Sequence, residues 1–190
     1  GREEQPVLDD EGKNLVIRRI AGKLEDDLKV LKGNLKKQGY ISEVKSVISE
    51  FVQYGVDFDK LDDFMEGLSQ ESYLYYKLQD IRKVYEGFEE YLRDRYITKE
   101  EMLDVLARAV CDSELLKGSV IALDGFTGFT PVQIRLISEL LKVSEKVIVT
   151  VEIDRREDPF IYRHPYQLFA LSKQMVTSLV KTAQDAGAEV

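Results

Sequence analysis

The stretch SVIALDGFTGFTP, residues 119–131, ends a run of small apolar residues at Asp124 and continues at once into Gly125. A buried parallel strand that ends in this way delivers a carboxylate to the edge of a sheet, where nucleotide and metal sites form. A second apolar run, residues 146–153, is followed by Asp154. We therefore expect both carboxylates at the same edge of a sheet.

Three roles are open for Asp124. As the Walker-B-type acid of a P-loop nucleotidase it would orient Mg²⁺ through its water shell, and a glutamate usually follows to polarise the attacking water. As the nucleophile of a metal phosphohydrolase it would need a second acid two residues on, where the chain has Phe126. As a structural residue it would cap the turn before Gly125.

A phosphate-binding loop of the form G-x-x-x-x-G-K-[ST] does not occur in the 190 residues. We therefore expect that this chain by itself does not hydrolyse ATP. The single cysteine, Cys111, excludes an internal disulfide, and together with the single His164 it argues against a zinc site. This cysteine usage indicates a reducing, cytoplasmic location, and we expect Cys111 to be a buried helical residue. No apolar run reaches the roughly 18 residues of a membrane span, so no membrane partner is expected.

The elements that must position the two acids begin at about residue 116. Thr130 as a cap and Pro131 in the first turn predict a helix between the two apolar runs, which makes a βαβ unit with a parallel sheet. A polar loop and a final amphipathic helix from Gln167 follow. The predicted fold class is α/β, with residues 116–190 as a partial core of two strands and flanking helices.

The preceding part of the chain, residues 1–115, is predicted to be a helical subdomain. Apolar residues recur there at spacings of three and four, as in Ile81, Tyr85 and Phe88, which indicates helices that pack along one face. Thr98 with Glu101 three residues later forms a capping box. The helices are expected at 9–31, 42–54, 58–68, 71–94 and 99–111. The tyrosines of this part either pack internally or stack on bases.

The formal net charge of −8 argues against a wholly basic nucleic-acid surface, but the charge is unevenly distributed. Residues 13–45 hold nine basic and four acidic side chains. This run is either a solvated helix face or a stripe that faces phosphates. The possible DNA contacts are Arg18, Arg19, Lys23, Lys29, Lys32, Lys36 and Lys37.

The segment LDGFTGFTPVQ, with KVIVTVEID after it and RRIAGKLEDDLKVLK, LQDIRKVYEGFEEYL and ITKEEML before it, resembles the B subunits (AddB or RexB) of bacterial ATP-dependent helicase/deoxyribonucleases. The resemblance covers nearly the whole chain. It implies an internal fragment of a superfamily-1-helicase-like half, with a P-loop, helicase-like parallel sheet and residues 1–115 as a large all-helical insertion. The chain start without methionine and its stop soon after a helix agree with an excised piece.

Compared with the helicase motifs II and III, this chain retains the aspartates and lacks the catalytic residues that follow them. Motif II reads D-E-F-Q-D, whereas this chain has Asp124, Gly125, Phe126, Thr127 and Gly128 at those positions. Motif III reads G-D-x-x-Q, and here Asp154 is retained while Glu157 replaces the glutamine. The resemblance therefore implies a degenerate motor domain that does not hydrolyse nucleotide, because Gly125 has no carboxylate to activate water.

The resemblance also implies partners. The family works as a heterodimer of the B subunit with an A subunit, and it acts on double-strand DNA ends and single strands in recombinational repair. Cofactors are expected in the parent only: ATP with Mg²⁺, for which Asp124 is a possible metal contact, and an iron–sulfur cluster outside this segment. The alternative is a stand-alone interaction module that binds a protein partner through Tyr73 and Tyr76.

Overall fold

The computed structural model describes residues 5–34 and 37–190, and the chain divides into two compact units, residues 1–102 and 103–190. The division falls inside helix α5 (Lys99–Ala109), whereas the sequence pattern changes at about residue 116. The reason is that the second half of α5 contacts the α/β part. Asp104 forms an ion pair of 2.6 Å with Arg135 of the following helix.

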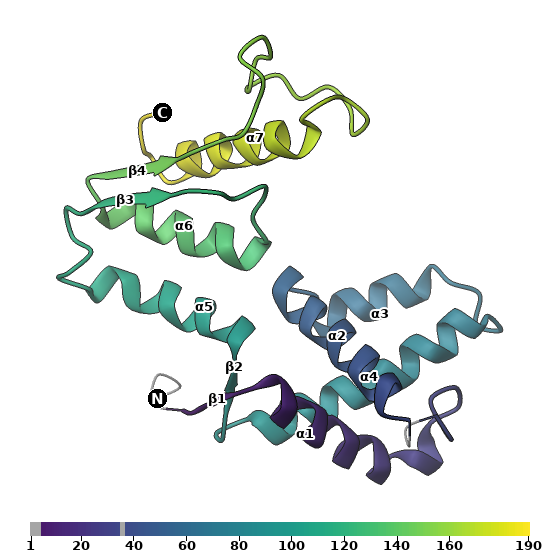
Figure 1. Ribbon diagram of the computed structural model, residues 1–190. Coiled ribbons are helices and arrows are strands. Elements are labelled where there is room, and N and C mark those ends of the chain that lie inside the picture. The colour runs from purple at the N-terminus through teal and green to yellow at the C-terminus, as the bar shows by residue number, and fades with distance from the viewer. Residues whose placement is uncertain (1–4, 35–36) are drawn as a thin grey trace. The chain divides into compact units, whose positions relative to one another are not determined.

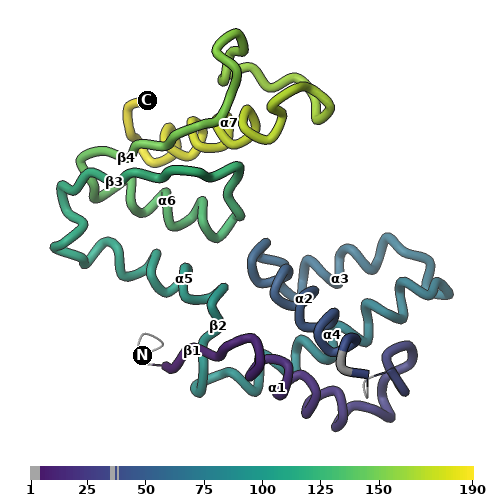
Figure 2. The backbone as a smooth tube through the Cα atoms, viewed as in Figure 1, coloured from purple at the N-terminus to yellow at the C-terminus, as the bar shows by residue number. Residues whose placement is uncertain are grey.

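The first unit is a helical bundle joined by one short ladder (Figure 1). Its core is made where α1, α2 and α4 pack against one another. The chain trace in Figure 2 shows α1 and α4 running side by side. Its elements are β1 (Val7–Leu8), α1 (Asp10–Lys23), the 3-10 helix η2 (Glu25–Asp27), α2 (Gln38–Tyr54), α3 (Phe58–Glu66), α4 (Tyr73–Leu92) and β2 (Ile97–Thr98), with β1 and β2 parallel.

Side-chain caps explain where several of these helices begin and end. Asp57 accepts a hydrogen bond from the Lys60 amide at the start of α3, and Ser72 does the same for α4. Gly55 ends α2 in the left-handed region at φ 64°, which a glycine adopts without strain. The predicted helices at 42–54, 58–68 and 71–94 are confirmed to within a few residues.

The prediction of a helix over 9–31 is wrong beyond Lys23. The chain leaves the helix there because a distant carboxylate binds the backbone that follows. Asp80 on α4, 1% exposed, accepts hydrogen bonds from three successive amides, those of Lys29, Val30 and Leu31, at 2.6–3.1 Å. These amides cannot then donate to carbonyls within a helix, so Asp80 replaces helical hydrogen bonds with a tertiary anchor.

A second buried charge joins the two ends of the first unit, α1 and the start of α5. Lys13 on α1 is 1% exposed and donates to both oxygens of Glu100 at 2.7 and 2.9 Å. Burial, the largest single effect, raises the pKa of the Glu100 carboxyl. The hydrogen bond and positive charge of Lys13, together with further hydrogen bonds to the carboxylate, outweigh burial and hold that pKa below the ordinary 4.5. The predicted capping box beside it is confirmed, since Thr98 and Glu101 exchange hydrogen bonds of 2.8 and 3.2 Å.

The second unit contains a parallel strand pair, as predicted. It consists of the end of α5, the 3-10 helix η3 (Val110–Asp112), β3 (Val120–Leu123), α6 (Pro131–Val143), β4 (Lys146–Val149) and α7 (Ala170–Asp185). In the ladder, Ala122 pairs with Ile148 and Leu123 with Val149. The expected strand over 146–153 is shorter than predicted, because β3 turns away at Gly125 (φ 78°) and leaves residues 150–153 without a partner strand.

The βαβ unit covers one face of its sheet and leaves the other exposed. Val147, Val149 and Val151 line one groove together with α6 and α7. On the opposite face, Val120 is 59% and Ile148 41% exposed. Parallel sheets are normally covered on both faces, so this face is an apolar surface available for further packing.

Two details of the second unit correct the sequence analysis. The final helix begins at Ala170 rather than at Gln167, after Phe169 in the left-handed region. Cys111 is exposed, not buried, because it lies in η3 rather than on the inner face of α5. Its thiol donates to Glu139 on α6 at 3.4 Å, and this contact raises the pKa of Cys111.

We expect Asp80→Ala to lower the free energy of unfolding by about 3 kcal/mol or more, because three backbone amides lose a charged acceptor in a buried place. Urea denaturation of the variant and the parent chain measures this. Asp63→Ala removes an exposed carboxylate from α3 and is the control, with a change below about 0.5 kcal/mol. Equal effects of the two substitutions would contradict the anchoring role of Asp80.

The Lys13–Glu100 pair predicts a defined pH dependence. Because folding lowers the pKa of Glu100, the pair stabilises the fold fully above about pH 4.5 and this contribution disappears as the pH falls through the lowered folded-state pKa. The stability difference between the parent chain and Glu100→Gln should therefore be largest near pH 7 and shrink below about pH 4. A difference that stays constant over this range would show that the pair does not titrate as described.

Candidate functional site

The two strand-end acids lie past the carboxyl ends of β3 and β4. Asp124 directly follows β3 and is exposed. The hydroxyl of Thr150, the residue after β4, donates to the Asp124 carboxylate, and the Thr150 amide donates to Leu123 O at 3.0 Å. The parallel register therefore places an aspartate and a threonine beside each other at the sheet edge. Thr150 had not been singled out from the sequence, although its position at the end of the second apolar run was a signal for it.

The residues after Asp124 form an exposed turn. Gly125 adopts φ 78°, a conformation that strains residues with a side chain, and Thr127 and Gly128 are exposed in the same turn. Thr130 then starts α6 with a complete capping box, in which it exchanges hydrogen bonds with Gln133. The turn thus presents Asp124 at the sheet edge and offers no second carboxylate next to it.

Asp154 is bound within its own turn. Its carboxylate accepts from the Arg156 amide at 2.9 Å and from the Arg156 guanidinium at 2.7 and 3.0 Å. The Arg156 side chain, through these hydrogen bonds, lowers the pKa of Asp154. Among the described contacts Asp154 has none with Asp124, whose carboxylate accepts a hydrogen bond from Thr150.

Glu157 is tied to the final helix. Its carboxylate accepts a hydrogen bond of 2.5 Å from Lys173 on α7. The Lys173 residue is only 5% exposed, whereas the Glu157 side chain is 38% exposed. This pair attaches the loop after β4 to the α7 surface, so Glu157 has a structural partner at the position where the helicase pattern has glutamine.

The loop between β4 and α7 exposes a run of large apolar side chains that the sequence analysis missed. Tyr166 is 93% exposed, and several neighbours are exposed as well. The signal was present, since residues 155–166 combine aromatic residues with arginines and prolines in one loop. The exposed members in the loop are Phe160, Ile161, Tyr162, Tyr166 and Leu168, and Leu171 in the first turn of α7 is exposed as well. Exposed aromatic and apolar residues concentrated in this way mark contact surfaces for other molecules.

The basic residues proposed as DNA contacts do not form one uniform face. Arg18, Arg19 and Lys23 are exposed on α1, and Lys29 lies over the Tyr76 ring. Two others are engaged locally: Lys32 pairs with Asp26 at 3.0 Å, and Lys37 donates to Asn34 at 3.1 Å. Lys36 lies outside the described residues.

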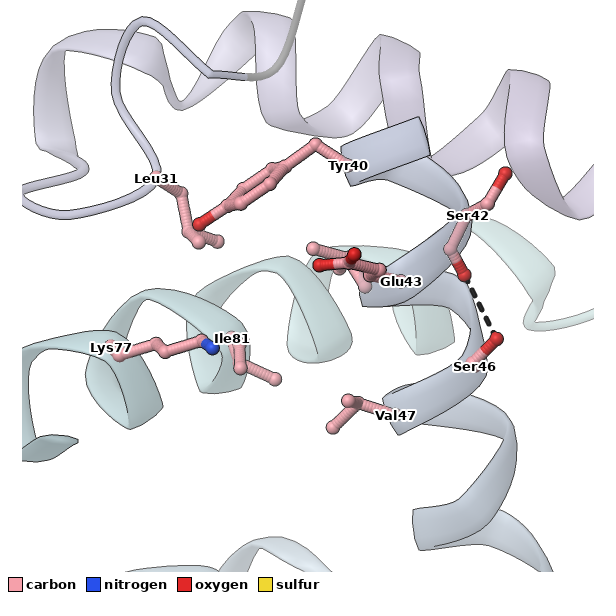
Figure 3. Close-up of a pocket in the computed structure, with 9 residues that line it drawn as sticks. Leu31, Tyr40, Ser42, Glu43, Ser46, Val47, Lys77 and Ile81 are labelled. Carbon is pink, nitrogen blue, oxygen red and sulfur yellow. Dashed lines mark hydrogen bonds between the residues drawn. The ribbon is translucent and has the colours of Figure 1, made fainter. Parts of the chain in front are cut away.

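A cavity of about 420 Å³ lies between the start of α2 and α4 (Figure 3). Its apolar wall includes Leu31, Val44 and Ile81, and the charged residues that line it are Glu43 and Lys77. Figure 3 shows Tyr40 reaching from α2 toward Leu31. Burial, and then the nearby Tyr73, raises the pKa of Tyr40. A larger groove of about 810 Å³ runs along β4 and α7 and is mainly apolar.

Within residues 5–34 and 37–190, no three or more His, Cys, Asp or Glu side chains gather as they would around a metal ion. In the same part of the chain, no helix has both the length and the hydropathy that crossing a bilayer requires.

A parallel strand pair with flanking helices, in one chain with a helical unit, defines an α/β protein. A family model described as "ADDB, N-terminal" matches residues 1–190. The chain belongs to this family.

Relatives support the same membership. A protein of Lachnoclostridium phytofermentans, named as the B subunit of an ATP-dependent helicase/deoxyribonuclease, is 40% identical over 96% of this chain and 16% of its own length. Proteins with the same name from Caldanaerobacter subterraneus and Ruminiclostridium cellulolyticum are 33% and 29% identical over 94% and 97% of this chain. The chain spans 15–16% of the length of these curated relatives.

The Glu157–Lys173 pair predicts an asymmetric response to substitution. Glu157→Ala leaves a buried ammonium without its partner and should cost about 3 kcal/mol of unfolding free energy. Lys173→Met keeps the apolar packing of the side chain and leaves a half-exposed carboxylate that water can solvate, so its cost should stay below about 1 kcal/mol. Urea unfolding of both variants tests this, and equal costs would contradict the burial argument.

Proposed function

We propose that this chain is part of the B subunit of an ATP-dependent DNA helicase/exodeoxyribonuclease that processes double-strand breaks for recombinational repair. Family membership and the names of the relatives support this proposal. The parent protein works in the cytoplasm as a heterodimer with an A subunit, and its substrates are double-strand DNA ends and the single strands made from them.

Within that parent protein, residues 116–190 act as part of a P-loop, helicase-like core that does not hydrolyse nucleotide, and the helical residues 1–115 are an insertion in it. The observation that carries this proposal is that Asp124, at the edge of the sheet, is followed directly by Gly125. The carboxylate that would orient Mg²⁺ is present, while the next position has no side chain to activate water. Asp124 alone cannot both orient Mg²⁺ and activate the attacking water.

The residues at this edge suit a bound nucleotide only in part. Asp124 and Thr150 carry oxygen donors of the kind that Mg²⁺ prefers, and the phosphates would be held by another part of the protein. ATP bound with Mg²⁺ would then connect this segment to the part of the parent protein that holds the phosphates. Asp124 would then position the ion, and Gly125 would keep the site without a base.

The segment therefore shapes the path of the DNA and the contacts between subunits. The exposed aromatic loop after β4 and the basic residues of α1 support this role, because stacking faces and cations are the groups that bind single strands and phosphates. The alternative, a stand-alone module built on Tyr73 and Tyr76, has less support, since the relatives carry this segment as only 15–16% of their length.

We expect Asp124→Ala in the full-length protein, assembled with its partner, to change the rate of ATP hydrolysis by less than about twofold, because this site performs no chemistry. A steady-state ATPase assay in the presence of DNA measures this rate. Asp112→Ala, at an exposed acid of η3, is the matched control. A loss of more than about tenfold in the Asp124 variant alone, with assembly unchanged, would mean that this site hydrolyses ATP.

A further inference from the structure

A line of cations follows the contact between α1 and α4, which we call the α1–α4 seam. On α4, Tyr76, Lys83, Gly87 and Tyr91 share the edge that faces α1, at spacings of seven, four and four residues. Cationic side chains from α1, from the loop after η2, from α4 and from the turn after α4 lie along this edge. The seam is defined by Arg19, Lys29, Lys83 and Arg95, with Tyr76 and Tyr91 beneath them.

One end of the seam is held by the Asp80 anchor. The Lys29 ammonium lies 4.2 Å from the centroid of the Tyr76 ring. The Lys29 backbone is fixed, because its own amide and the next two donate to Asp80. The buried Asp80 carboxylate therefore fixes the backbone from which the Lys29 ammonium reaches over the ring.

The other end carries two guanidinium groups on one ring. Arg95 lies 4.9 Å and Arg19 5.8 Å from the centroid of Tyr91. Gly87 permits α1 to approach α4 here, since a Cβ at this position would come within 2.7 Å of Ile20. The ring attracts both guanidinium groups, and a guanidinium held over an aromatic face keeps N–H groups for an anionic ligand.

Lys83 lies between the two ends and donates to the Asp27 carbonyl at 2.7 Å. None of Arg19, Lys29, Lys83 and Arg95 forms an ion pair with another described residue. Acidic residues also lie near them in the sequence, among them Asp26, Asp27, Glu90 and Asp94, and of these Asp26 is paired with Lys32. The seam is thus a row of oriented cations, and not a broad positive field.

We propose that the α1–α4 seam binds the phosphodiester backbone of a DNA strand. This inference rests on the proposed function and narrows it. Of the seven basic residues proposed as DNA contacts it keeps only Arg19 and Lys29, and it adds Lys83 and Arg95. Tyr76 and Tyr91 are about 22 Å apart along the α4 axis at 1.5 Å per residue. This length covers about six phosphates of one strand of a duplex.

The test uses the full-length protein assembled with its partner. Arg19→Gln with Arg95→Gln should lower the slope of log affinity against log salt by about 1.8 on duplex ends, or by about 1.4 on a single-stranded oligonucleotide. Fluorescence anisotropy with the two DNA probes shows whether the α1–α4 seam binds duplex or single-stranded DNA. Tyr91→Leu keeps every charge, and it should weaken binding without the full loss of slope, because the cations remain but are no longer oriented.

Lys32→Gln with Lys37→Gln removes the same charge from the neighbouring loop and should leave the slope unchanged. Thermal melting of each variant checks that the fold is retained. An unchanged slope in the Arg19/Arg95 variant, or an equal loss of slope in the Lys32/Lys37 control, would overturn the proposal that the α1–α4 seam binds DNA. A parent complex that binds neither probe would instead refute the proposed function.

Discussion

The parallel register of β3 and β4 is the constraint on which the candidate site depends. Because Leu123 is paired with Val149, the next residues of the two strands, Asp124 and Thr150, meet at one edge. A shift by one residue would move the side chains of one strand to the opposite face. The turn at Gly125 and the cap at Thr130 then return the chain into α6, so strand end, turn and helix start act as one local unit.

Buried charges organise the helical unit and, separately, the loop after β4. Asp80 anchors the segment after α1, Lys13 joins α1 to the start of α5, and Lys173 attaches the loop after β4 to α7. Each of these groups would be costly to bury without its partner, so each fixes one geometry of the chain. In the helical unit, the same network that ends α1 also orients Lys29 over Tyr76, which links stability to the proposed DNA contacts.

Local sequence signals predicted much of the fold. The apolar spacing indicated the helices α2, α3 and α4. The capping box at Thr98 and the cap at Thr130 marked helix starts correctly, because a cap needs only residues three apart. What failed depended on distant partners. The end of α1 is set by Asp80, 51 residues from Lys29, and the strand after Lys146 stops because its neighbour turns away. For the site, Asp124 could be selected from its pattern, whereas its contact with Thr150 required the strand register.

The register can be measured by cross-linking. In a Cys111→Ser background, Ala122→Cys and Ile148→Cys place thiols on paired residues of the exposed sheet face, within the Cα separation of about 4.4–6.8 Å that a disulfide needs. The parallel register predicts rapid disulfide formation under mild oxidation for this pair. It predicts none for Ala122→Cys with Val147→Cys, whose side chains point to opposite faces. Preferential cross-linking of the second pair would contradict the parallel register, and with it the placement of Asp124 beside Thr150.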